Sequence, residues 1–264
     1  MSIIVTVYVP GAIVMASDSR QSIIIQHQKG PESPPQSFET VNSDSVYKTF
    51  LFPRQHIGVS SYGDYILGGI FLQTLLLDFQ EGLVEQDDIC TVAEKLLKYF
   101  RRYAPEANTS FHIAGFKKEN RTSHAWVYTC HVGRNELNRV NLRPNGDKRP
   151  MYGATWGGQT DVLAALLGPS KLVQEGPHPN IQMPIIWEAM AVQDAIDFAI
   201  YAVQTTIDTI RFQARSKSVG GPIDTLLITP EETRWIQRKV LTGKASHTPF
   251  DTHLTTLENH VLSG

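Results

Sequence analysis

The sequence is short of the features that mark secreted, membrane-spanning or nucleic-acid-binding proteins. Its 264 residues include only two cysteines, Cys90 and Cys130, which are too few for a disulfide framework and fit a reducing compartment. No run of about eighteen apolar residues could span a membrane. Its 24 basic and 26 acidic side chains nearly cancel, and no basic patch stands out. Nucleic acid is therefore not an expected partner.

The N-terminal ten residues carry no positive leader before their apolar run and no small-residue cleavage site after it. They are rich in β-branched side chains and predict a strand rather than a signal peptide, so a cytoplasmic protein is expected. No CxxC or HExxH spacing occurs. A metal site built from His112, His124, Cys130 and His131 is therefore only a minor alternative, and no metal or cofactor is predicted.

The hydrophobic periodicity predicts strands, two helices, strands, two helices and strands, in that order. Apolar residues recur four apart after Asp64, which is placed to cap the first helix, and the second helix begins near Asp87 and Asp88. The predicted strands cover residues 3–9, 12–16, 47–52, 55–61, 110–116, 124–132, 137–142, 223–229 and 233–240, and the later helices end near residues 167 and 212.

Each predicted helix pair has one apolar face, and the strands are too numerous for a single helix-covered sheet. Two antiparallel sheets stacked face to face, each covered outside by helices, would bury every apolar face. The sequence therefore predicts an α+β fold, a four-layer αββα sandwich, as one domain over residues 1–242. Residues 30–45 hold three prolines and predict an inserted surface loop, and residues 243–264 predict a polar tail.

Ser2 directly follows the initiator methionine, and a small second residue allows Met1 to be removed after synthesis. The product would carry a serine hydroxyl and a free α-amine on the same residue. Such an amine has a pKa of about 7.7–8.0, so an unprotonated fraction can accept the hydroxyl proton at neutral pH. This combination is an activated nucleophile that carries its own base, comparable to a serine–histidine pair.

The segment from Gly11 to Arg20, GAIVMASDSR, resembles the proteasome β-subunit family of N-terminal nucleophile hydrolases. That family includes the peptidase subunit of a simpler bacterial ATP-dependent protease and the ancestral β subunit. Its nucleophile lies sixteen residues before the aspartate of this motif, and sixteen residues before Asp18 is Ser2, whereas Thr6 does not meet this offset. The resemblance implies that Ser2 is the catalytic nucleophile.

The segment Val46-Tyr-Lys48-Thr-Phe resembles the lysine-bearing strand of the family, which makes Lys48 the expected catalytic lysine and Asp18 its carboxylate partner. A buried ammonium beside the nucleophile would lower the pKa of the α-amine and help to polarise the hydroxyl. An ordinary strand lysine is the alternative for Lys48. Arg20 is expected to brace Asp18 or nearby loops rather than take part in the chemistry.

Residues 57–64, IGVSSYGD, resemble the family's strand and small-residue turn before the first helix. The resemblance makes the backbone N–H of Tyr62 or Gly63 the oxyanion donor, because a helix N-terminus offers unpaired N–H groups. The ring of Tyr62 departs from the usual glycine and would restrict the substrate pocket. Ser60 falls where the family lines its specificity pocket.

The resemblance returns at residues 218–229, which carry a Gly-Gly turn into a late strand, so it spans about residues 2–240. Two supporting positions depart from the family pattern. Thr155 stands where the family uses a serine, and Ser216 stands where an acid is expected. Full activity is therefore not implied by the motifs alone.

The nucleophile and the spacing differ as well. The family mostly uses threonine, whose branched Cβ restricts χ1, so Ser2 is expected to be less well aimed and to favour slow turnover. Thirty residues separate Asp18 from Lys48, against about sixteen in the family. The proline-rich loop at residues 30–45 accounts for the excess and would overhang the site.

The resemblance implies a hydrolase that cleaves peptide or amide bonds through an acyl-enzyme on Ser2. It also implies self-assembly into rings, and leaves any ATP-dependent unfoldase partner unknown. One alternative is a catalytically weak or inactive proteasome-fold scaffold subunit. Another is a serine hydrolase that uses Ser60 or Ser61, but their context does not match Gly-x-Ser-x-Gly and the chain lacks the β/α alternation of that class.

Overall fold

Two five-stranded antiparallel sheets form the centre of the computed structural model, which describes residues 2–27, 36–119, 121–143, 149–167 and 184–241. In the first sheet the order is β12 (Gly153–Gly158), β1 (Ile3–Val9), β2 (Ala12–Ser17), β13 (Asp224–Ile228) and β14 (Thr233–Gln237). In the second it is β11 (Glu136–Arg139), β10 (Thr122–His131), β9 (Thr109–Glu119), β6 (Ile57–Gly63) and β5 (Thr49–Phe52).

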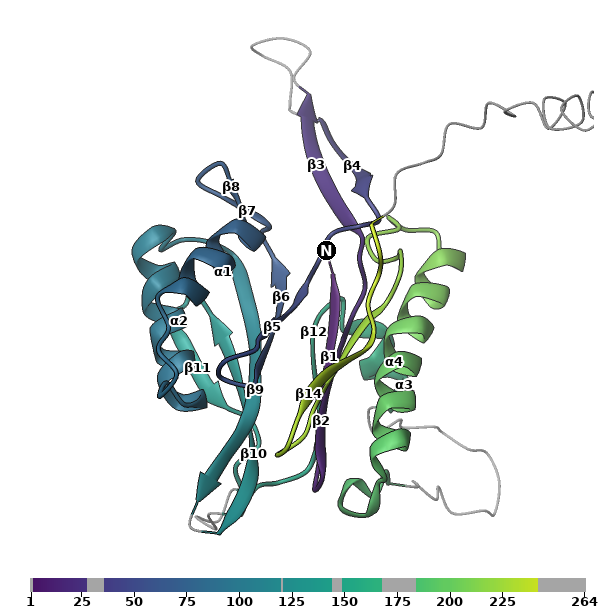
Figure 1. Cartoon of the computed structure of the whole chain (residues 1–264). Coiled ribbons are helices and arrows are strands. Elements are labelled where there is room, and N and C mark those ends of the chain that lie inside the picture. The colour runs from purple at the N-terminus through teal and green to yellow at the C-terminus, as the bar shows by residue number, and fades with distance from the viewer. Residues whose placement is uncertain (1, 28–35, 120, 144–148, 168–183, 242–264) are drawn as a thin grey trace, which may run out of the picture.

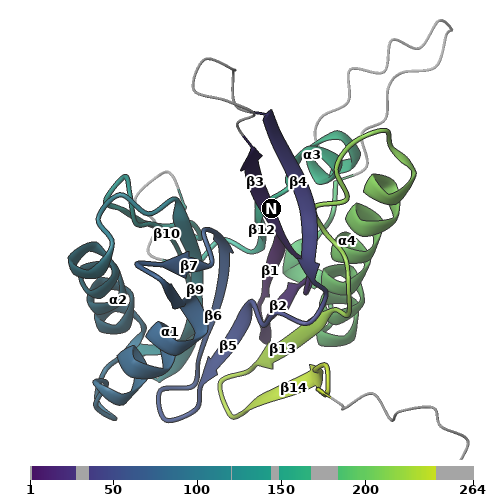
Figure 2. The ribbon, with the colours of Figure 1, turned by 90° about the horizontal axis from the view of Figure 1, so that it is seen from above.

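Helices cover the outer face of each sheet (Figure 1). They are α1 (Leu72–Glu81), α2 (Ile89–Tyr103), α3 (Asp161–Leu167) and α4 (Val192–Phe212), and a short 3-10 turn, η1 (Trp187–Ala189), precedes α4. Helix α4 packs on β1 and β2, and α2 packs on β9 and β10. The view from above shows the same arrangement, with the two sheets between the helix pairs (Figure 2).

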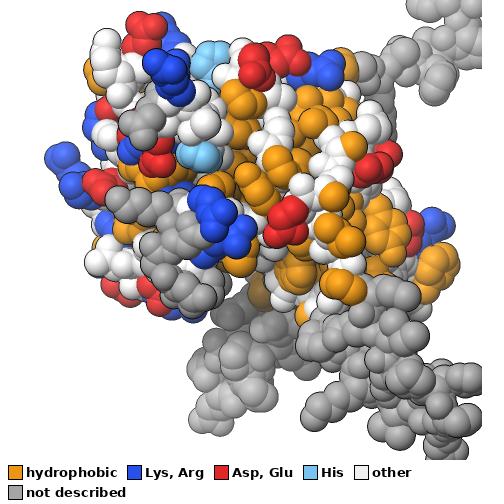
Figure 3. Space-filling model, turned by 90° about the horizontal axis from the view of Figure 1, so that it is seen from below, with side chains coloured by type: hydrophobic (Ala, Val, Ile, Leu, Met, Phe, Trp, Pro, Cys, Tyr) orange, Lys and Arg blue, Asp and Glu red, His pale blue; other side chains and the backbone are white. Residues whose placement is uncertain are grey.

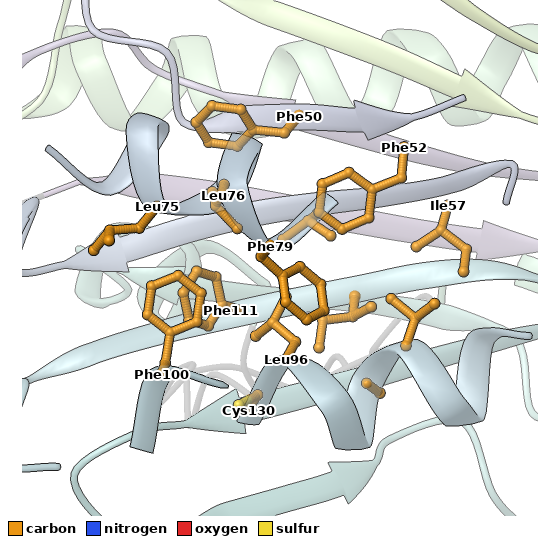
Figure 4. Packing of buried hydrophobic residues seen from close by; sticks show 14 of the residues in the cluster. Phe50, Phe52, Ile57, Leu75, Leu76, Phe79, Leu96, Phe100, Phe111 and Cys130 are labelled. Carbon is orange, nitrogen blue, oxygen red and sulfur yellow. The ribbon is translucent and has the colours of Figure 1, made fainter. Parts of the chain in front are cut away.

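Three apolar clusters hold these parts together. One joins the second sheet to α1 and α2 and contains the rings of Phe52, Phe79, Phe100 and Phe111 (Figure 4). Another joins β1, β2 and β13 to α3 and α4, and the third lies between the sheets, where Met15 is buried. Strand β1 is buried over its whole length because Ile3, Val5 and Val7 face α4 while the alternate residues face the other sheet.

The structure confirms the predicted α+β class, with antiparallel sheets and four helices among the described residues. Helix α2 begins as predicted: Asp88 is its N-cap and accepts a hydrogen bond from the backbone N–H of Thr91 at 2.9 Å. Arg101 and Arg102 lie in its last turn, where positive charge complements the helix dipole.

The predicted start of the first helix at Asp64 is wrong. Residues after Asp64 form a small hairpin of β7 (Ile66–Leu67) and β8 (Ile70–Phe71), and α1 begins only at Leu72. The hairpin turns at Gly68 and Gly69, which both have positive φ, +57° and +84°, as a two-residue turn of this kind requires. The apolar spacing that predicted an earlier helix start therefore includes side chains of this hairpin.

The predicted surface loop at residues 30–45 is wrong over its second half. Residues Gln36–Ser43 form β4, which pairs with β3 (Gln21–His27) in a separate antiparallel arm. Residues 28–35 and the tail predicted at 243–264 lie outside the described residues. Strands β3 and β12 were not predicted. The sequence of β12 resembles a glycine-rich turn, but this strand pairs with β1 from Ile3 to Tyr8.

No helix of the described residues is long and apolar enough to cross a membrane. The underside of the molecule, opposite the β3–β4 arm, carries a group of apolar side chains between charged margins (Figure 3).

Candidate active site

The carboxylate of Asp18 accepts hydrogen bonds from several segments of the chain beside the N-terminal strand. Asp18 follows β2 directly and is fully buried. Its Oδ1 accepts hydrogen bonds from the backbone N–H of Ile3 at 2.9 Å and from Lys48 Nζ at 2.6 Å. Its Oδ2 accepts from the backbone N–H groups of Arg20 at 3.1 Å and Gly220 at 3.0 Å. Three of these four donors are distant from Asp18 in the sequence.

The ammonium of Lys48 lies next to the residue that the sequence singles out as the nucleophile. Lys48 Nζ and the N–H of Ile3 share one carboxylate oxygen, and that N–H belongs to the peptide unit that follows Ser2. Nζ also donates to the carbonyl oxygen of Arg20 at 2.6 Å. Complete burial lowers the pKa of Lys48 below its usual value, and the attraction of Asp18 offsets part of this shift.

Ser2 is buried and is held by the strand on its other side. Its carbonyl oxygen accepts a hydrogen bond from the backbone N–H of Gln159 at 2.6 Å, and Ile3 pairs with Gly158 in the β1–β12 ladder. In the full-length sequence the Ser2 nitrogen is bonded to Met1. Among the described residues, no hydrogen bond joins the Ser2 hydroxyl to Lys48, whose Nζ donates to Asp18 and to the carbonyl of Arg20.

Gly158 controls how closely β12 approaches Ser2. Its φ is +91°, and a Cβ at this position would lie 2.0 Å from the carbonyl oxygen of Ser2. We therefore expect Gly158→Ala to lower the free energy of unfolding by about 2 kcal/mol or more and to displace Ser2. Urea unfolding measures this, with Gly153→Ala on the same strand as control, because a Cβ there meets only ordinary contacts with Tyr8. Equal stability of the two variants would contradict the expectation.

A cavity of about 460 Å³ opens beside Ser2. Ser2 and Lys48 form part of its wall, the end of β6 and the β7–β8 hairpin form another part, and the β3–β4 arm forms a third, while Arg20, Val46, Leu72 and Asn108 complete it. Figure 1 shows the start of β1 near the base of this arm. The volume is in the range of small-molecule and peptide-side-chain sites in proteins.

The cavity includes some of the residues predicted for it and omits others. Tyr62 and Gly63, the predicted oxyanion and substrate-binding positions, line it. Since α1 begins at Leu72, they do not lie at a helix N-terminus, and that part of the prediction is wrong. Ser60 does not line the cavity: its Oγ lies between the sheets, 2.9 Å from Thr49 Oγ1. Its neighbour Ser61 lines the wall instead.

Thr155 and Arg20, predicted as supporting residues, have different positions. Thr155 pairs with Thr6 in the β1–β12 ladder, four residues from Ser2, which is roughly 13 Å along a strand. The structure therefore does not bring Thr155 to the site. Arg20 lines the cavity, and its guanidinium donates to both carboxylate oxygens of Asp44, at 2.6 and 2.8 Å. Its side chain braces Asp44 rather than Asp18.

A second buried ion pair, which sequence reasoning missed, lies behind the first. Lys239 Nζ pairs with Asp224, and both side chains are almost fully buried. Burial is the main cause of the lowered pKa of Lys48, and Asp18 opposes it. The positive charge of Lys239 adds a smaller lowering effect. Asp224 pairs with Ser17 across the β2–β13 ladder, next to Asp18. No local pattern signals this pair, because Asp224 and Lys239 come together only when β13 and β14 form their hairpin.

The side chains considered for a metal site do not come together among the described residues. His112 is buried on β9, with Nδ1 3.0 Å from Thr6 Oγ1, and its burial lowers its pKa to about 3. Cys130 packs on the α1–α2 side of the same sheet, and burial raises its pKa to about 12. His124 contacts Thr122 near the end of the β9–β10 hairpin.

No family model matches the chain, and no curated protein matches its sequence. Among solved structures, the chain is similar to the Gly-1 mutant of Anbu from Hyphomicrobium sp. strain MC1, with a TM-score of 0.56. The two share 15% sequence identity, and the similarity covers 98% of this chain and 92% of that one. At this identity the comparison shows a similarity of fold and nothing about activity.

The assignment to the proteasome β-subunit family, made from short motifs, is therefore wrong as a statement of family. What the comparisons show in its place is a similarity of fold to Anbu at 15% sequence identity. The motifs around Asp18 and Gly220 instead follow from the local geometry, since both segments supply groups to one carboxylate site.

Proposed function

We propose that this chain is an amide or peptide hydrolase that uses Ser2 as an N-terminal nucleophile once Met1 has been removed. We further propose that its two sheets and flanking helices constitute a four-layer αββα sandwich of the kind that such enzymes use. One observation carries the proposal: Asp18 joins the Lys48 ammonium to the peptide unit after Ser2, and both Ser2 and Lys48 line a cavity.

The proposed reaction needs no cofactor. The free α-amine of Ser2 takes the hydroxyl proton as Oγ attacks the substrate carbonyl, and the Lys48 ammonium beside it disfavours protonation of that amine. The oxyanion of the tetrahedral intermediate accepts hydrogen bonds from backbone N–H groups at Tyr62 or Gly63. The leaving amine then takes the proton, the acyl group remains on Oγ, and water releases it by the same steps.

An electrophilic peptide inhibitor, such as a peptide epoxyketone or vinyl sulfone, tests the proposal. Intact-protein and peptide mass spectrometry should show one adduct at residue 2 of the Met1-free protein. Ser2→Ala should remove the adduct, whereas Ser61→Ala, which deletes another hydroxyl of the cavity wall, should keep it. Equal labelling of Ser2→Ala and the parent protein would show that the nucleophile is a different residue.

A catalytically inactive scaffold subunit is the second candidate. Two observations favour it: Thr155 lies away from Ser2, and no described hydrogen bond links the Ser2 hydroxyl to Lys48. The mass of the native protein separates the candidates, since a retained Met1 or an acetylated Ser2 leaves no free amine to act as base.

We also propose that copies of the chain associate, and native mass spectrometry of the same sample measures that assembly.

A further inference from the structure

The charged side chains that line the cavity are not balanced. Four of the described lining residues carry charge: Arg20, Lys48, Glu39 and Asp64. Each cation already has its own carboxylate outside the cavity wall, because Arg20 pairs with Asp44 and Lys48 pairs with Asp18. Within the described residues, the charge left over on the wall is therefore negative.

The two acidic side chains of the wall are held by neutral donors. Asp64 Oδ2 accepts a hydrogen bond from the backbone N–H of Asn108 at 2.8 Å. Glu39 Oε1 accepts one from Ser22 Oγ at 2.5 Å. Neither acid forms an ion pair with a lysine or arginine side chain in the part of the chain that the structure describes.

Glu39 is ionised and fixed in place at neutral pH. Burial acts to raise its pKa, but Ser22, Ser216 and the positive charge of the chain's N-terminus hold the pKa below its usual value. Ser22 lies on β3, the strand that pairs with β4, so its hydrogen bond holds the carboxylate within the β3–β4 arm. A fixed carboxylate loses little conformational freedom when it binds a cation.

The remaining wall suits the stem of a long side chain. Ile23, Ile24, Ile66 and Leu72 line the cavity together with the acids. Lysine and arginine side chains lay their methylene stems on apolar surface while their charged heads contact polar groups. A cavity of about 460 Å³ with apolar walls, and with a carboxylate that has no lysine or arginine partner among the described residues, has the chemistry for such a side chain.

We propose that this cavity selects ligands that carry a lysine- or arginine-like side chain, with Glu39 as its counter-charge. The inference rests on the proposed function in that it names the acyl side chain of the substrate. The inference concerns ligand binding alone, so a binding measurement can test it separately from hydrolysis. Glu39 is then a specificity-determining residue contributed by the β3–β4 arm.

Isothermal titration with two matched ligands tests this inference. N-acetyl-arginine amide carries the cation, and N-acetyl-citrulline amide is its neutral isostere. The unmodified protein should bind the arginine ligand about tenfold to a hundredfold more tightly than the citrulline ligand. Glu39→Gln keeps the shape and an acceptor for Ser22 but should abolish this preference. Glu232→Gln removes one carboxylate on the β13–β14 turn, outside the cavity wall, and should keep it.

Equal binding of the two ligands by the unmodified protein would overturn the inference. So would a preference that survives in Glu39→Gln, or one that Glu232→Gln loses to the same extent. These outcomes do not depend on Ser2, since the titration needs no bond cleavage. If the arginine preference holds while Ser2 is not labelled by an electrophile, the proposed function fails and the cation site remains.

Discussion

Asp18→Asn is expected to lower the free energy of unfolding by about 3–5 kcal/mol and to abolish activity. The ammonium of Lys48 would remain buried without its counter-charge. Asparagine also offers one acceptor oxygen where four donors now converge on two, so the N–H groups of Arg20 and Gly220 would face an NH₂ group. Thermal unfolding measures the effect, which should lower Tm by roughly ten degrees.

Two further variants identify the cause of that loss. Asp44→Asn removes the more exposed carboxylate that pairs with Arg20. It should lower the free energy of unfolding by about 1 kcal/mol or less. The double variant Asp18→Asn with Lys48→Met removes both buried charges and should regain part of the stability while staying inactive. A Tm for Asp18→Asn within a degree of the unmodified protein would show that Asp18 does not hold this site together.

Protein that keeps Met1 is expected to be at least a hundredfold slower than protein that begins at Ser2. The peptide nitrogen of Ser2 in the longer form cannot accept a proton, so the nucleophile loses its base. A cleavable N-terminal fusion that leaves Ser2 first supplies the processed form, and inhibition of methionine removal during expression supplies the other. Amide hydrolysis by each form is then compared at equal concentration.

The pH dependence of the processed form gives an independent readout. Activity should rise with pH as the α-amine loses its proton, with a midpoint near or below the ordinary α-amine pKa of about 7.7–8.0, because the Lys48 ammonium favours the neutral amine. Acetylation of Ser2 should abolish this rise together with the activity. Equal rates of the Met1-bearing and processed forms would exclude the free amine as the catalytic base.

Much of the scaffold could be predicted from local pattern. The β-branched opening strands, the helix that Asp88 caps and the apolar stripe of α4 each carry a signal within a few residues. The offset from Ser2 to Asp18 is also a local quantity, because β1 and β2 form a hairpin whose register pairs Ile4 with Ser17. Asp18 and Lys48 were singled out by the motif resemblance rather than by this register, and the structure joins their side chains.

Other parts of the site had no local signal. The start of α1 was misplaced because Leu67 and Phe71 keep helical spacing while Gly68 and Gly69 allow a hairpin there. Ser60 was placed in the pocket, but its hydroxyl lies between the sheets beside Thr49, and the residues of β6 that reach the wall are Ser61, Tyr62 and Gly63.

Composition and periodicity by themselves determined the α+β class and the order of most elements. Only the tertiary structure decided which polar groups meet: Gly220 at Asp18 and Asp224 at Lys239. The physical reason is that local periodicity reports the face a residue buries, whereas pairing across a sheet brings together segments that are up to two hundred residues apart. The arrangement of Asp18 and Lys48 beside this cavity depends on such pairings.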